Sequence, residues 1–135
     1  MCPICAAPDT PIATPGGERA IAELVPGDLV YSLEPSGIVA VPILRVGSTP
    51  VSQHQVLHIT LDSGAVLELS PGHPTASGSP LSSLRPGDRL DELHAIVSIE
   101  LVPYRYARTY DILPSSSSGS YFAGGAALGS TLAQR

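Results

Sequence analysis

A serine and a histidine separated by a tight turn, Ser70-Pro71-Gly72-His73, are the first residues in this chain that could do chemistry together. Pro71 and Gly72 are strong turn formers and follow a run of β-forming residues. Such a turn holds a hydroxyl beside an imidazole that can give or take a proton near neutral pH. Taken alone, however, a histidine in a turn is more often a solvated surface residue.

The composition favours a single globular domain made of short elements. The chain has 135 residues, of which 43% are hydrophobic, enough to bury a core. Its 13 glycines and 14 prolines favour many turns over long helices. The formal charge of −5, without a basic stripe, gives no electrostatic basis for binding nucleic acid.

Several functional classes lack their sequence signals. No apolar run approaches the ~20 residues of a membrane span, and no signal peptide is recognisable. The localisation therefore stays open, since a longer precursor could still be exported. All seven basic residues are arginine, which excludes lysine chemistry, and the chain contains no asparagine. Cys2 and Cys5 are its two cysteines, too few for a disulfide framework.

A sequence repeat suggests internal symmetry. Residues 21–30 and 81–90 both read apolar-x-x-Leu-x-Pro-Gly-Asp-x-apolar, and a glycine-containing turn precedes each copy. One supersecondary unit used twice explains this pattern and predicts a compact domain with pseudo-twofold symmetry. Asp28 and Asp88, one in each copy, are expected to cap turns.

Short alternating stretches predict an all-β fold. Residues 56–70 form the clearest hairpin, with Asp62-Ser63-Gly64 as its turn. No window shows a sustained apolar period of 3.6 residues, so helix is limited to a turn or two. The other expected strands lie within residues 9–14, 38–46, 95–102, 104–113 and 121–125.

Five motifs occur in a fixed order from Cys5 to about Ser130: Cys5-Ala6-Ala7-Pro8-Asp9-Thr10-Pro11-Ile12, Leu24-x-Pro26-Gly27-Asp28, Ser70-x-x-His73, Arg108-Thr109-Tyr110-Asp111-Ile112 and Tyr121-Phe122-Ala123. In this order they resemble the Hint domain, which inteins, hedgehog C-terminal domains and bacterial intein-like proteins share. The resemblance implies a flat, horseshoe-shaped, pseudo-twofold β-fold. It makes residues 5–135 the domain and residues 1–4 the end of an upstream polypeptide.

The same resemblance implies an autoprocessing reaction at the peptide bond between Ile4 and Cys5. Cys5 would be the nucleophile of an N–S acyl shift, and His73 would protonate the departing amine. Ser70 would hold or polarise the scissile peptide. Asp111 would either orient His73 or activate the incoming nucleophile, and the sequence does not separate these two roles.

The departures from the family pattern limit the reaction. Splicing inteins end in His-Asn and cyclise that asparagine, whereas Gly129-Ser130 stands at the corresponding place here. Without any asparagine, splicing by this route is impossible, and the acyl group is expected to pass to water or a small nucleophile. Ser70 replaces the family threonine, which keeps the hydroxyl but loses the methyl group that helps to position it.

Two readings of the whole chain stay open: a single-turnover self-cleaving domain, and a degenerate Hint fold with a structural or interaction role. A Cys2–Cys5 disulfide would tie up the nucleophile as a redox gate, unless Cys2 belongs to the upstream protein or is there by chance. With no second cysteine pair, a four-cysteine zinc site is not expected in one chain, nor is any cofactor. We expect a monomer. His54, His58 and His94 match no family motif, and their default placement is the surface or a strand face.

Overall fold

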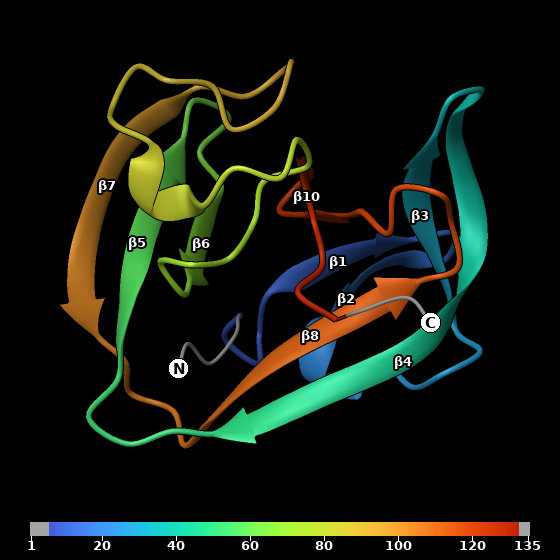
Figure 1. Cartoon of the computed structure of the whole chain (residues 1–135), viewed down its shortest axis with the longest axis horizontal. Coiled ribbons are helices and arrows are strands. Elements are labelled where there is room, and N and C mark those ends of the chain that lie inside the picture. The colour runs from blue at the N-terminus through green and yellow to red at the C-terminus, as the bar shows by residue number, and fades with distance from the viewer. Residues whose placement is uncertain (1–5, 133–135) are drawn as a thin grey trace.

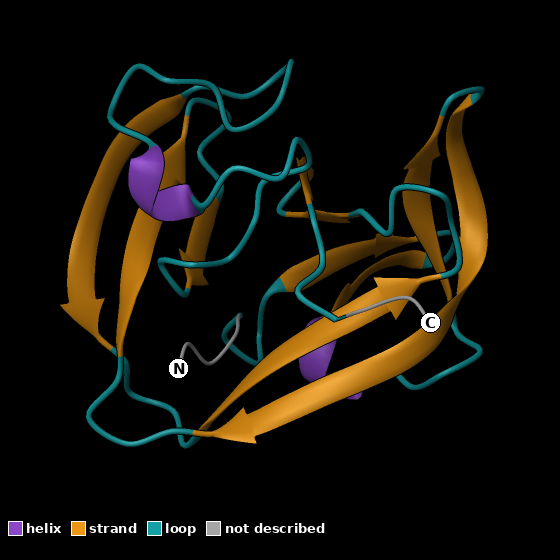
Figure 2. Ribbon diagram, in the orientation of Figure 1, coloured by secondary structure: helices purple, strands orange, loops and turns teal. Residues whose placement is uncertain are grey.

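The computed structural model describes residues 6–132 and confirms the all-β fold, as Figures 1 and 2 show. This part of the chain forms ten strands and two single-turn 3₁₀ helices, and within it no helix is long and apolar enough to cross a membrane. The elements are β1 (Pro11–Thr14), β2 (Gly17–Ala20), η1 (Ile21–Glu23), β3 (Leu29–Glu34), β4 (Gly37–Pro50), β5 (Gln55–Leu61), β6 (Val66–Leu69), η2 (Leu81–Ser83), β7 (Ile96–Pro103), β8 (Arg108–Pro114), β9 (Tyr121–Ala123) and β10 (Ala126–Leu128).

The strands pair antiparallel in three small sheets, with orders β10-β9-β1-β2, β3-β4-β8 and β6-β5-β7. In Figure 1, β4 and β8 run together along one side of the molecule, β5 and β7 stand on the other, and β9 and β10 lie between them. The predicted hairpin is β5–β6, and Gly64 takes a φ of +92° in its turn. Glycine adopts this conformation without steric cost.

Three strands were not predicted: β2, β3 and β10. The strand β10 depends on a turn in which Gly124 and Gly125 both have positive φ, +58° and +86°. Two such residues make a hairpin turn, so the chain folds back after β9 where the sequence suggested one terminal strand. The expected strand at residues 104–113 begins at Arg108.

The predicted repeat is confirmed, because the two copies make the same hydrogen bonds. Each aspartate caps its own turn by accepting a backbone N–H, as expected, and each copy is tied to one isoleucine further along the chain. The matched contacts are Val25 N–H to Asp28 Oδ2 at 3.0 Å and Arg85 N–H to Asp88 Oδ2 at 2.8 Å, then Gly27 N–H to Ile43 O at 2.9 Å and Gly87 N–H to Ile96 O at 2.8 Å.

The repeat extends further toward the N-terminus than the sequence suggested. The N–H of His73 donates to the carbonyl of Ser70 at 3.0 Å, and the N–H of Thr10 donates to the carbonyl of Ala7 at 3.1 Å. In each copy the 3₁₀ helix then donates to the proline of that turn, from Ala22 to Pro8 and from Ser82 to Pro71. The Ser70–His73 turn is thus the symmetry counterpart of the turn that follows the predicted nucleophile.

The hydrophobic core fills the space between the sheets. Alternate residues of β6 and of the second half of β5 point inward, whereas the end of β8, from Asp111 to Pro114, is buried without alternation. The largest fully buried apolar side chains include Ile12, Ile59, Leu61, Leu67, Leu69, Ile112 and Leu128. Tyr121, Asp111 and His73 are buried in the same interior, and these polar groups need partners there.

Candidate active site

The Ser70–His73 turn has its two end residues fully buried, while Gly72 at its tip is exposed. Ser70 follows β6 directly, and Pro71 and Gly72 then bring the chain around so that His73 N–H donates to the Ser70 carbonyl. The carbonyl of His73 accepts the N–H of Leu81 in η2 at 3.0 Å. A solvated surface histidine is therefore the wrong reading of this turn.

The hydrogen bonds of the His73 ring fix its tautomer. Its Nε2 lies 2.9 Å from the carbonyl oxygen of Gly129 and 3.3 Å from the hydroxyl of Tyr121. A carbonyl only accepts, so Nε2 carries the proton. Burial lowers the pKa of His73, against the opposing effects of the Asp111 charge and the Gly129 carbonyl. The ring is thus neutral at pH 7, and Nδ1 carries a lone pair.

The lone pair on Nδ1 of His73 accepts no hydrogen bond from the described residues. Nδ1 of His73 is buried and has no hydrogen-bond partner in residues 6–132. Buried polar atoms are almost always hydrogen-bonded, so an exception calls for an explanation. A buried basic nitrogen with a free lone pair can take a proton from a reacting group and give it back.

Asp111, on β8, accepts hydrogen bonds at both carboxylate oxygens. Oδ1 accepts the Tyr121 hydroxyl at 2.6 Å and the backbone N–H of Ile112 at 2.9 Å. Oδ2 accepts the N–H of Thr131 at 2.7 Å and also the hydroxyl groups of Thr131 and Ser130. The carboxylate therefore holds the segment after β10 against the buried site.

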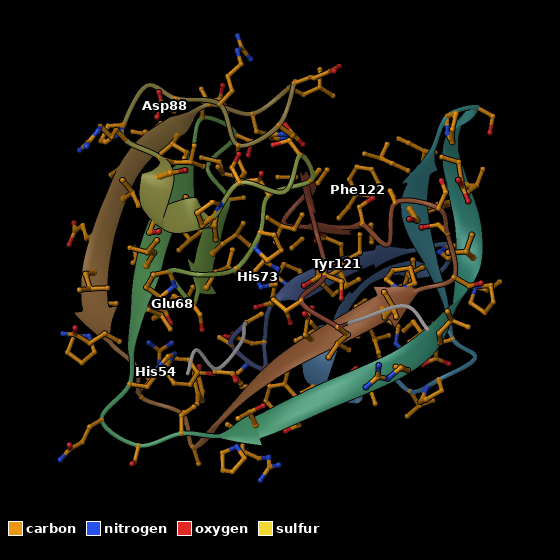
Figure 3. The ribbon with its side chains drawn as sticks, in the orientation of Figure 1. His54, Glu68, His73, Asp88, Tyr121 and Phe122 are labelled. Atoms are coloured by element: carbon orange, nitrogen blue, oxygen red, sulfur yellow. The ribbon has the colours of Figure 1, made fainter. Side chains whose placement is uncertain are left out.

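Tyr121 connects Asp111 to His73, and sequence reasoning missed this role. The Tyr121 hydroxyl donates to Asp111, while its oxygen lies close enough to His73 Nε2 to share that proton with the Gly129 carbonyl. Figure 3 shows the His73 and Tyr121 side chains next to each other in the middle of the molecule. The available signal was its place in the Tyr121-Phe122-Ala123 motif, which gave no role for its hydroxyl.

Ser70 has a second neighbour that the sequence did not indicate. Nε2 of His54, just before β5, lies 3.1 Å from Ser70 Oγ. The His54 ring also meets the edge of Tyr104, with 5.7 Å between the ring centroids. The default surface placement is compatible with the half-buried ring of His54, but it gave no sign of this contact with Ser70. It holds better for His58, which pairs with Glu68 on a strand face, and for His94, which pairs with Asp91 near the surface.

The chain enters the site at Ala6, the first described residue. Ala6 forms bridges to both Leu69 and Tyr110, the residues that precede Ser70 and Asp111. Its N–H donates to the Tyr110 carbonyl at 2.9 Å, and the Tyr110 N–H donates back at 2.9 Å. The structure thus brings Ser70, His73 and Asp111 together around this entry point. The predicted site residues Cys2, Ile4 and Cys5 lie outside the described residues.

Gly129 is required where the chain leaves the site. A Cβ at this position would lie 2.8 Å from the carbonyl oxygen of Thr75, a distance that real side chains do not adopt. Glycine lets the backbone pass this close, and its carbonyl can then reach His73 Nε2. A backbone carbonyl thus occupies the position beside Nε2 of His73.

Other features of the described part do not compete with this site. A groove of about 610 Å³ has Leu33, Leu93 and Phe122 in its lining, but neither Ser70 nor His73. Within residues 6–132, no three histidine, cysteine, aspartate or glutamate side chains are placed to hold a metal ion.

Comparison with known proteins finds likenesses at the level of structure. No protein-family profile matches the sequence, and no curated protein matches it either. The gp41-1 intein is 26% identical, with a TM-score of 0.70, and the match covers 93% of this chain and 97% of the intein. A bacterial intein-like domain from Clostridium thermocellum is 20% identical, with a TM-score of 0.78 over 97% of this chain and 99% of that domain. A DnaB intein from Synechocystis sp. PCC 6803 is 14% identical, with a TM-score of 0.77 over 95% of this chain and 99% of the intein.

Proposed function

We propose that this chain, which has the intein (Hint) fold, is a single-turnover autoprocessing domain that acts on the peptide bond between Ile4 and Cys5. The fold itself suggests autoprocessing and implies a flanking polypeptide. In the proposed reaction the Cys5 thiol attacks the carbonyl carbon of Ile4, and an N–S acyl shift converts the amide into a thioester. Residues 1–4 then belong to the upstream polypeptide and residues 5–135 to the domain.

The unpartnered Nδ1 of His73 is the observation that carries this proposal. The acyl shift forms a C–S bond, breaks the C–N bond and moves one proton from the thiol to the departing amine. Neutral His73 accepts that proton at Nδ1 and returns it to the nitrogen, so no net proton is lost or gained. While His73 is positively charged, Asp111 stabilises it through the hydroxyl of Tyr121.

The position of Ala6 supports the choice of bond. Cys5 is joined to Ala6, and consecutive Cα atoms are only ~3.8 Å apart. Ala6 is bridged to the residues before Ser70 and Asp111, so the residue that follows the proposed nucleophile is held against the segments that carry these side chains. The hydroxyl of Ser70 polarises the Ile4 carbonyl and stabilises the oxyanion that forms on it.

The thioester is resolved by transfer to water or to a small nucleophile. Cyclisation of asparagine plays no part, because the chain contains none. Release of the upstream polypeptide is therefore the product, and the segment after Thr131 stays attached. Asp111 acts by stabilising charged His73, since five donor groups already occupy its two oxygens.

A fusion of a folded reporter protein before Cys5 tests the proposal. The purified precursor is incubated with and without dithiothreitol, and its intact mass is followed over time. The expected fragment ends at Ile4, either as its thioester with dithiothreitol or as the free acid that hydrolysis gives. This fragment should be absent from the Cys5→Ala variant. A precursor that stays intact with and without thiol contradicts self-cleavage and supports the degenerate, structural reading of the fold.

A further inference from the structure

His54 contacts the site from outside the five motifs, and two interactions hold its ring while one backbone hydrogen bond anchors its main chain. Its carbonyl accepts the N–H of Tyr104 at 2.8 Å, and its ring meets the Tyr104 ring edge to face. Its Nε2 then lies 3.1 Å from Ser70 Oγ. In Figure 3, His54 lies on the same side of the molecule as Glu68, a residue of β6 that precedes Ser70 by two positions.

The direction of this hydrogen bond decides what Ser70 can do. A serine hydroxyl has one proton to donate and two lone pairs that accept. If Ser70 donated its proton to His54, that proton would be unable to polarise a carbonyl. If His54 donates instead, the Ser70 proton is free to point at the reacting group.

We infer that His54 is a positioning residue, which donates its Nε2–H to Ser70 Oγ and so directs the Ser70 hydroxyl toward the carbonyl of Ile4. This inference rests on the proposed function. The two histidines near Ser70 then have separate tasks, since His73 moves a proton and His54 aims a hydroxyl. Donation by His54 also polarises the Ser70 O–H bond, which strengthens its hydrogen bond to a developing oxyanion.

The resembled family has threonine where this chain has Ser70, and this difference explains why a contact from His54 would be needed. A β-branched threonine is stiff at χ1, which helps to aim its hydroxyl. Serine lacks that restraint, and a second hydrogen bond from His54 restores it from outside. Burial also lowers the pKa of His54, so the ring is neutral at pH 7 and has one N–H to donate.

Three single variants test the role through the rate of thiol-induced release. His54→Phe keeps an aromatic ring beside Tyr104 but removes the donor, and we expect release about tenfold slower. His54→Gln keeps an amide donor and should recover most of that loss. The matched control is His58→Gln on the same strand region, whose partner is Glu68, and it should cleave like the unmutated precursor. Unchanged release from His54→Phe would overturn the inference, as would equal slowing in all three variants.

Variants at Ser70 separate positioning from general damage. In a Ser70→Ala background there is no hydroxyl to aim, so adding His54→Phe should slow release no further. In a Ser70→Thr background the stiffer side chain should reduce the effect of His54→Phe to less than about threefold. Additive slowing in both backgrounds would mean that His54 acts otherwise than through Ser70.

A measurement that needs no cleavage keeps this inference apart from the proposed function. In the uncleavable Cys5→Ala precursor, nitrogen NMR at pH 7 reports which ring nitrogen of His54 carries the proton. We expect a protonated Nε2 whose shift moves on Ser70→Ala. An unprotonated Nε2 overturns the role of His54 even if the precursor cleaves. If the expected shift is seen but the unmutated precursor never cleaves, the hydrogen bond between His54 and Ser70 is supported. That result overturns the proposed function and the role of His54 in it.

Discussion

The hydroxyl of Tyr121 donates to Oδ1 of Asp111 at 2.6 Å, and the hydroxyl oxygen of Tyr121 lies 3.3 Å from Nε2 of His73. Asp111 is thereby linked to the buried imidazole without touching it. A direct carboxylate–imidazole contact would favour the charged form of His73 strongly. The intervening phenol moderates that effect, so burial still prevails and lowers the pKa of His73.

Replacing Tyr121 with phenylalanine should slow cleavage and leave the fold intact. The variant removes the hydroxyl that connects the Asp111 carboxylate to the His73 ring. The positively charged form of His73 is therefore less stable in the variant. We expect release about tenfold slower, within the range of general acid–base effects, and a loss of about 1 kcal/mol in unfolding free energy.

The control for this variant is Tyr106→Phe, which removes an exposed hydroxyl that contacts Arg105. Rates come from intact mass and stability from urea unfolding. A Tyr121→Phe precursor that cleaves as fast as the control would show that Asp111 does not act on His73 through this hydroxyl.

Replacing Gly129 with alanine should disturb both stability and cleavage. The added Cβ would meet the Thr75 carbonyl oxygen at 2.8 Å, so the backbone must shift and carry its own carbonyl away from His73. We expect a loss of about 1–3 kcal/mol in unfolding free energy, together with slower release. Gly16→Ala is the matched control, since its Cβ would find its nearest atom at 3.9 Å. Equal stability of the two variants would contradict the close packing at Gly129.

Asp91 should stabilise the fold at neutral pH but not in acid. Burial raises its pKa, but the N–H of Ala127, the His94 ring and the N–H of Leu93 outweigh burial, so the pKa of Asp91 is lowered overall. A carboxyl whose pKa is lower in the folded state contributes stability above its unfolded pKa, near 4, and loses it as the pH falls through the folded value.

Asp91→Asn should therefore lower the free energy of unfolding by about 1–2 kcal/mol at pH 7. The difference in this free energy from the unmutated chain should shrink as the pH falls below about 4. Urea unfolding at several pH values measures it. Asp62→Asn, in the exposed β5–β6 turn, serves as the control and should change little at any pH. A cost for Asp91→Asn that stays constant down to pH 2 would contradict a charge-dependent contribution.

Cys2 is proposed as a redox gate on Cys5, and both residues lie outside the described part of the chain. A disulfide between them would occupy the nucleophile, so the oxidised precursor should stay intact until a reductant is added. Cys2→Ser should cleave equally fast under oxidising and reducing conditions. If Cys2→Ser is no faster than the unmutated precursor under oxidising conditions, the gate does not exist.

The sequence was sufficient for those features that depend on local patterns. Alternation and turn residues predicted the all-β class and the β5–β6 hairpin, and the Pro-Gly-Asp repeat predicted symmetry that the hydrogen bonds around Asp28 and Asp88 confirm. The motif order predicted that Ser70, His73 and Asp111 share one site. In the structure all three are buried, Tyr121 connects His73 with Asp111, and Ser70 lies at the other end of the His73 turn.

The rest depends on contacts between distant segments, which no local pattern encodes. His54 reaches Ser70 across the end of the β5–β6 pair, and a single histidine before a strand gives no sign of this. Gly129 contacts His73 across 56 positions through its backbone carbonyl, an atom that every residue has. Tyr121 stood in a recognised motif, but nothing in that motif indicated that its hydroxyl connects Asp111 to His73.

Trapping the acyl intermediate tests the central claim most directly. A precursor with a reporter before Cys5 is treated with hydroxylamine at neutral pH, and the mass of the released fragment is measured beside a Cys5→Ala control. An amide resists hydroxylamine under these conditions, whereas a thioester reacts. The account predicts a fragment ending at Ile4 as its hydroxamate, from the unmutated precursor alone. Release at another bond, release from Cys5→Ala, or no release under reducing conditions would contradict it.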